Sequence, residues 1–366
     1  MESDFLKVIR HNCQISDAKD SGIYSMCMLF LRLRNLYKWE KGLPPWQEPE
    51  PPELLDWISA REEFWEEIQA QPFGSVPVGG SMLDPFDCKA INAALPDADL
   101  VYGAGYGRQM KSVFFLARLV EERQVEGCPT VVLGREEGRE LASPFAMTQD
   151  GVIFFRKEPF RFFLWDRIHE ALPSAGDALV GALQPYGLLK EGGGVDLEGL
   201  RQQLDFLVDQ EMEPIIHHEV GEMRDISIDA QAMEAVYTKF SGTAAELFVR
   251  GLKDILSDLH PQGMLGHILT HEKSSSLGFY LLFLDGLRKV LFPELAAAYT
   301  LFCMSGDWDL IRKASDQCLT NNLHRAEILA DIGTRLPNLS EEQGAAIIEK
   351  ELLCPFGLEM PKPEKI

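Results

Sequence analysis

The feature that most constrains the fold is a run of three glycines, Gly192–Gly194, between Glu191 and Val195. Each glycine inside a helix costs about 1 kcal/mol relative to alanine, so this run predicts a linker. The chain has 366 residues, more than a single hydrophobic core usually serves. We therefore expect two domains, residues 1–190 and residues 191–366, joined at the glycine run.

The two sides of this linker differ in their residue pattern. After helical spacing in the first 70 residues, short apolar runs alternate with glycine and proline. Strands are predicted at 100–102 and 130–134, with a glycine-rich turn and a helix over 110–122 between them, the outline of a βαβ unit. Beyond the linker nearly every segment has helical spacing. The sequence thus predicts an α-rich α+β protein, with an N-terminal mixed domain carrying a small, partly parallel sheet and an all-helical C-terminal domain.

Caps and a proline set the predicted helix boundaries after the linker. Pro214 suits the first turn of a helix. Asp229 and Ser340 are predicted N-caps, and Gln343 follows Ser340 at the spacing of a capping box. The expected helices span residues 197–212, 214–223, 229–259, 263–291, 294–302, 308–320, 323–334 and 340–353.

Most of the chain's histidines lie in one stretch. Of 8 histidines, five fall between His217 and His271, and Glu219 and Glu222 stand beside the first two. On a helix, His218, Glu219 and Glu222 converge on about a third of the circumference, whereas His217 points toward the opposite edge. Glu219 falls among apolar residues, and a carboxylate there needs a partner or a bound cation.

A second group of ligand-type residues follows on a later helix. His267 and His271 are four residues apart, the spacing by which two imidazoles on one helix share a metal ion. We expect a divalent zinc, iron or manganese ion in this domain. The predicted ligands are His218, Glu219, Glu222, His267 and His271, with His217, His260 and Glu272 as additional ligands.

The expected metal site loosely resembles the carboxylate-bridged dinuclear sites of helical bundles. It lacks their Glu-x-x-His pairs, and the chain has no His-Glu-x-x-His motif of a zinc protease. The ligand set suits hydrolytic and redox metals alike, so the residues predict a metal-binding protein or metal-dependent enzyme without naming its reaction.

A weaker candidate is an anion or nucleotide site at Gly103, Gly105, Gly107 and Arg108. A glycine-rich turn that enters a helix lets backbone N–H groups approach an anion. However, the spacing is Gly-x-Gly-x-Gly, and no Lys-Ser/Thr pair follows as in a phosphate-binding loop. A tight turn with close backbone packing is the simpler explanation of these glycines.

The charge and the cysteines limit the partners and the compartment. The formal net charge is −22, which repels phosphate backbones and predicts no nucleic-acid partner. The seven cysteines are scattered without a Cys-x-x-Cys pair, and no apolar run reaches membrane-spanning length. We expect a cytoplasmic protein that does not enter the membrane. As an alternative to a metal site, the acidic helical domain would bind a protein partner without catalysis.

Three stretches together resemble an uncharacterised bacterial protein family. They are the segment Tyr37–Trp46, the turn at 102–107 with Phe114–Ala117 after it, and the segment His217–Glu222. These stretches lie in both expected domains. The resemblance implies a free-standing bacterial cytoplasmic protein and lends no activity to any residue.

Overall fold

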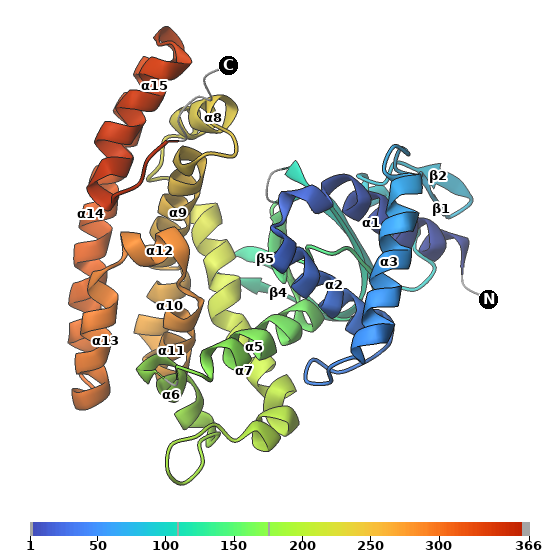
Figure 1. Ribbon diagram of the computed structural model, residues 1–366, viewed down its shortest axis with the longest axis horizontal. Coiled ribbons are helices and arrows are strands. Elements are labelled where there is room, and N and C mark those ends of the chain that lie inside the picture. The colour runs from blue at the N-terminus through green and yellow to red at the C-terminus, as the bar shows by residue number, and fades with distance from the viewer. Residues whose placement is uncertain (1–2, 108–109, 175, 361–366) are drawn as a thin grey trace. The chain divides into compact units, whose positions relative to one another are not determined.

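The structure is a computed structural model that describes residues 3–107, 110–174 and 176–360. Internal contacts divide the chain into two compact units. The first consists of residues up to His169 together with Arg201–Met212, and the second of Glu170–Leu200 and the chain from Glu213 onward. Strands occur in the first unit, and helices dominate the second (Figure 1). This arrangement confirms the predicted α-rich α+β fold with a mixed N-terminal part and a helical C-terminal part.

The N-terminal unit combines helices with two antiparallel or mixed sheets. Its helices are α1 (Asp4–Asp20), α2 (Met26–Glu40), α3 (Pro51–Ile68), α4 (Cys88–Ala94) and α5 (Lys157–Ala171). Its strands are β1 (Val76–Val78), β2 (Ser81–Leu83), β3 (Leu100–Tyr106), β4 (Ser112–Val125), β5 (Cys128–Arg139), β6 (Ala146–Gln149) and β7 (Val152–Arg156). Strands β1 and β2 form a hairpin, and the larger sheet has the order β3-β4-β5-β7-β6. Only the β5–β7 pairing within it is parallel, as a partly parallel sheet requires.

The predicted helix over 110–122 is wrong, because these residues form strand β4. Phe114 and Leu116 pack into one hydrophobic cluster, whereas Val113, Phe115 and Ala117 pack into another. Both faces of the first half of the strand are therefore buried, which produces a continuous apolar run there. Such a run cannot be told from a buried helix by its periodicity. The predicted βαβ unit is instead an antiparallel pairing of β3 with β4 and of β4 with β5.

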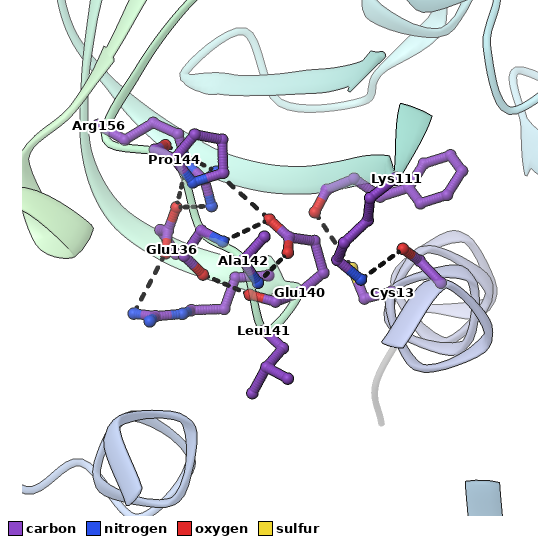
Figure 2. A network of polar contacts seen from close by, with 12 residues as sticks. Cys13, Lys111, Glu136, Glu140, Leu141, Ala142, Pro144 and Arg156 are labelled. Carbon is purple, nitrogen blue, oxygen red and sulfur yellow. Dashed lines mark hydrogen bonds and ion pairs between the residues drawn. The ribbon is translucent and has the colours of Figure 1, made fainter. Parts of the chain in front are cut away.

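A network of buried charges lies where β4, β5 and β7 meet α1 (Figure 2). Arg156 donates from Nε to Glu136 Oε1 at 2.6 Å, and Lys111 Nζ lies 3.1 Å from Asp17 Oδ1. The carboxylate of Glu140 accepts hydrogen bonds from the backbone N–H groups of residues 142 and 143. Together with Arg139, the network balances three acidic side chains against three basic ones, all at most 7% exposed. This matching is what allows the charges to stay buried.

The C-terminal unit is built from helices. Beyond the glycine run they are α8 (Ala230–Lys239), α9 (Ala244–Leu259), α10 (Met264–His271), α11 (Ser274–Phe283), α12 (Gly286–Leu291), α13 (Glu294–Ser305), α14 (Trp308–Arg335) and α15 (Glu341–Ile348). Before it lies α6 (Asp177–Leu183), and directly after it comes α7 (Leu197–Arg224), whose residues belong partly to each unit. Short helical turns occur at η1 (Ser21–Ile23), η3 (Gln184–Tyr186), η4 (Leu336–Asn338), η5 (Glu349–Leu353) and η6 (Cys354–Phe356).

Several predicted helix boundaries need correction. Pro214 lies inside the 28-residue helix α7 and does not begin a new helix. Residues 308–334, predicted as two helices, form the single helix α14, whereas residues 240–243 interrupt the predicted helix over 229–259. Residues 263–291 likewise divide into three helices. The caps were predicted correctly, since Asp229 accepts from the N–H of residue 232 and Ser340 forms a capping box with Gln343.

The glycine run forms a turn within the second unit. Gly192 and Gly193 have φ values of 101° and 94°, in the region that favours glycine. A single β-bridge between Leu189 and Val195 closes this turn. The run interrupts the helices as expected, although contacts place the residues on both of its sides in the same unit.

Candidate functional site

The candidate site lies between helices α7 and α9, which approach each other closely at Gly221. A Cβ atom at this position would lie 2.2 Å from the carbonyl oxygen of Ser257, so any other residue would push the helices apart. One turn of helix separates His218 from Glu222 on α7, and one turn separates Asp254 from Asp258 on α9. The close approach at Gly221 brings these two pairs of side chains face to face.

Asp258 fixes the orientation of the His218 imidazole. His218 donates from Nδ1 to Asp258 Oδ1 at 2.7 Å, and the hydroxyl of Tyr280 on α11 donates to Asp258 Oδ2 at 3.1 Å. Asp258 is fully buried, and Tyr280 is nearly so. Because Nδ1 of His218 is hydrogen-bonded to Asp258, only its Nε2 remains to interact with a ligand or another side chain.

Two further carboxylates, those of Glu222 and Asp254, lie close to His218. The distance from Nε2 to Glu222 Oε1 is 3.8 Å. His218, Glu222 and Asp254 each offer a ligand atom, and these three atoms all lie within 4.8 Å of one another. No other set of three or more such side chains meets this condition within the part of the chain that the structure describes. A neighbouring cation, Lys253, has its Nζ 3.1 Å from Glu222 Oε2.

The crowding of carboxylates shifts the ionisation of this cluster. Burial alone would lower the pKa of His218, but Asp258, and then Glu222 and Asp254, outweigh it and raise that pKa to about 10. Burial raises the pKa of the Asp254 carboxyl, and although His218 and Arg288 oppose this, Glu222 and Asp258 add to it. The mutual repulsion of the acids makes an additional positive charge favourable here.

The donor atoms suit a small divalent cation. An imidazole nitrogen and two carboxylates are ligands that zinc, manganese and iron accept. Histidines that bind metals generally donate their other ring N–H to a carboxylate or carbonyl, as His218 does to Asp258. All three ligand-bearing side chains are partly exposed, so an ion can reach them from solvent.

The structure places His217, His267 and His271 in a separate group. The ring centroids of His217 and His267 are 4.1 Å apart, and those of His267 and His271 are 4.3 Å apart. Burial, and then the two neighbouring imidazoles, lower the pKa of His267 to about 3. The structure groups His218 with Glu222 and Asp254 and not with these histidines. Whether His218 shares an ion with them stays a prediction.

The remaining predicted ligands have other surroundings. Glu219 is buried, at 8% exposed, but does not belong to the His218 group. The Nδ1 atom of His260 accepts from the backbone N–H of Gln262 at 3.1 Å. Glu272 ends α10 with a φ of 50° and accepts from Arg312 Nη2 at 2.8 Å. His260 and Glu272 thus make contacts near the ends of helices α9 and α10.

The glycines of the predicted anion site lie mostly in strand β3 and not in a turn before a helix. Gly103 pairs with Phe115 across the sheet, and a Cβ atom at Gly103 would lie 2.1 Å from the Phe115 ring. A Cβ atom added at Gly105 would lie 3.4 Å from the side chain of Met147, and one added at Gly107 would lie 3.3 Å from that of Val113. The glycines therefore make room for neighbouring side chains. Arg108 lies outside the described residues.

Asp254 and Asp258 were not predicted as site residues. Both lie in α9, whose apolar stripe includes Leu252, Ile255 and Leu259. The signal was present, because Asp258 falls inside this stripe as Glu219 does in its own helix. A search for acids four residues apart on a helix with an apolar stripe would have found the pair.

Two family models match the chain over most of its length. They are the N-terminal and C-terminal domains of a family of unknown function (DUF6866), and they match residues 4–156 and 161–351. The chain belongs to this family, which confirms the resemblance to an uncharacterised family; its bacterial origin stays a prediction. No curated protein and no solved structure matches the chain. In the described ranges, no helix combines the length and the apolar character that crossing a membrane requires.

Proposed function

We propose that this member of the family binds one divalent metal ion in its C-terminal helical unit, through His218, Glu222 and Asp254. The observation that carries the proposal is the convergence of their three ligand atoms within 4.8 Å. These side chains come from two helices, so the convergence is a tertiary arrangement and not a consequence of helical spacing alone.

The contacts of His218 support a metal site over a simple ion pair. In a surface ion pair, one carboxylate beside the imidazole suffices. Here Asp258 occupies Nδ1, Tyr280 holds Asp258 in place, Glu222 lies 3.8 Å from Nε2, and Asp254 belongs to the same group. A carboxylate that orients a metal-binding histidine also raises its basicity as a ligand.

Three protein ligands leave room for a water molecule or a substrate atom on the ion. Structural zinc sites are normally closed by four protein ligands, whereas catalytic sites keep one position open. An ion held by one histidine and two carboxylates therefore suits the activation of water or of a small oxygen-containing molecule. We infer that the unit carries a metal-dependent activity, with zinc, manganese and iron as the ions to compare.

Direct binding measurements test this proposal. Chelator-treated protein is titrated separately with Zn²⁺, Mn²⁺ and anaerobic Fe²⁺ in a calorimeter. We expect one ion per chain at the site and at least about a tenfold loss of affinity in Glu222→Gln and Asp254→Asn. His324→Gln is a matched control, because this histidine contacts Glu327 on an exposed helix surface. Equal affinity in the wild type and both site variants would overturn the proposal.

A further inference from the structure

The stack of His217, His267 and His271 has the features of a second ligand group. It joins helix α7 to helix α10 and contains imidazoles without an interposed carboxylate. His267 and His271 are one helical turn apart, and His217 comes from the other helix. Two elements thus contribute to the group, as they do at His218.

Two of these imidazoles have a defined tautomer. The backbone carbonyl of Gln262 lies 2.8 Å from His217 Nδ1, and the carbonyl of His267 lies 2.9 Å from His271 Nδ1. A carbonyl oxygen only accepts, so both Nδ1 atoms carry hydrogen. The lone pair of each neutral ring is therefore on Nε2. Such N–H contacts to backbone carbonyls are typical of histidines that bind metals.

The third imidazole presents a nitrogen without a protein partner. The Nε2 atom of His267 is buried and has no hydrogen-bond partner among the described residues. A buried polar atom left in this state costs about 1–3 kcal/mol, which a bound ligand or ion would recover. This atom lies on the middle ring of the stack, with His217 on one side and His271 on the other.

We propose that His217, His267 and His271 form a second metal site, distinct from His218, Glu222 and Asp254, for a late transition-metal ion such as Cu²⁺. A ligand set of imidazoles alone favours copper, nickel and zinc, whereas carboxylates favour harder ions. The rings are stacked in the present arrangement, and their ligand atoms do not form a group within 4.8 Å in the described residues. Binding therefore turns the rings so that the three Nε2 atoms face one ion.

The test removes the carboxylate-containing site first and uses Cu²⁺ alone as the probe. In the double variant Glu222→Gln, Asp254→Asn, we expect one Cu²⁺ per chain by dialysis and metal analysis. Pulsed electron paramagnetic resonance should show coupling to more than one imidazole. Adding His267→Gln to this background should weaken Cu²⁺ binding by at least about tenfold.

His271→Gln serves as a second variant, since His271 is exposed and its replacement leaves the core intact. His324→Gln in the same background is the control and should retain the copper signal. The absence of Cu²⁺ binding in the double variant would overturn the second site, as would unchanged binding after both His267→Gln and His271→Gln. Loss of Mn²⁺ binding in the double variant reports on the first site, because imidazoles alone do not favour this harder ion, so the two proposals fail independently.

Discussion

The chain contains two clusters of charged side chains that differ in exposure and in how their possible ligand atoms converge. In the N-terminal unit, Asp17 faces Lys111, and all the charged side chains of the network are buried. Arg156 bridges Glu136 and Glu140 there (Figure 2). In the C-terminal unit, the acids Glu222, Asp254 and Asp258 surround one histidine, and the side chain of Lys253 beside them is 34% exposed.

This difference separates a structural role from a functional one. In the N-terminal network, basic and acidic side chains are equal in number, and backbone N–H groups donate to the Glu140 carboxylate. At His218 the three acids face three basic groups, which are His218 itself with its raised pKa, Lys253 and Arg288, but the three converging ligand-bearing side chains are partly exposed. Burial of charge alone is therefore a poor indicator of function, whereas converging donor atoms on partly exposed side chains are a better one.

The largest expected effect is on folding, at Arg156. Replacing Arg156 with methionine removes the cation that Glu136 and Glu140 share and leaves only Arg139 beside Glu136, which should lower the free energy of unfolding by about 3–5 kcal/mol. Urea denaturation followed by circular dichroism measures the change. Arg335→Met removes an exposed ion pair with Asp331 and should cost less than about 1 kcal/mol. An equal decrease in the free energy of unfolding in the two variants would show that the buried network stabilises the fold no more than an exposed ion pair does.

The next effect is on metal affinity, at Asp258. Asp258→Asn keeps the size of the side chain but weakens its hold on His218 Nδ1, and metal affinity should fall about 10- to 100-fold. Calorimetric titration with Zn²⁺ measures this loss. The exposed residue Asp309 provides the control, and Asp309→Asn should bind as the wild type does. An unchanged affinity in Asp258→Asn would mean that Asp258 does not orient a ligand.

The metal-free protein should lose stability as the pH rises from about 6.5 to about 10. Because the folded-state pKa of His218 is raised to about 10, the folded chain keeps a proton that the unfolded chain releases above its ordinary pKa near 6.5. The contribution is fully present below pH 6.5 and decreases by up to about 1.36 kcal/mol per pH unit above it. Denaturation curves at several pH values should show this slope in the wild type and not in His218→Gln. A parallel slope in the variant would contradict the assignment.

The smallest effect is expected at Lys253. Its ammonium group lies 3.1 Å from Glu222 Oε2 and competes with a bound cation. Lys253→Gln should therefore tighten metal binding by about fivefold, corresponding to about 1 kcal/mol for one solvated charge at this range. Lys7→Gln removes a comparable exposed contact with Asp4 and serves as the control. Weaker binding in Lys253→Gln would indicate that Lys253 supports the site.

Local chemistry could be predicted from the sequence where it depends on a few neighbouring residues. The caps at Asp229 and Ser340 follow from side chains that reach the next turn of their own helix. By contrast, β4 is buried on both faces, so its apolar run has no period that marks a strand. Pro214 continues a helix because tertiary contacts outweigh its local preference.

The site was predicted in part, for a similar reason. The i, i+4 spacing placed His218 beside Glu222, a relation within one helix. Which residues complete the group depends on the packing of α9 against Gly221, and this close approach selects Asp254 and Asp258. The spacing of His267 and His271 was equally suggestive, yet packing groups them with His217. Spacing predicts the members on each helix, and only packing determines which helices meet.

The most direct test is an anomalous-scattering map of crystals grown with Zn²⁺ after chelator treatment. We predict a peak bonded to His218 Nε2 at about 2.0–2.1 Å, with Glu222 and Asp254 oxygens at about 2.0–2.2 Å. Glu222→Gln crystals grown in the same way should lose or weaken that peak. A map of the wild-type protein without a peak between α7 and α9, at saturating zinc, would contradict a metal site at these residues.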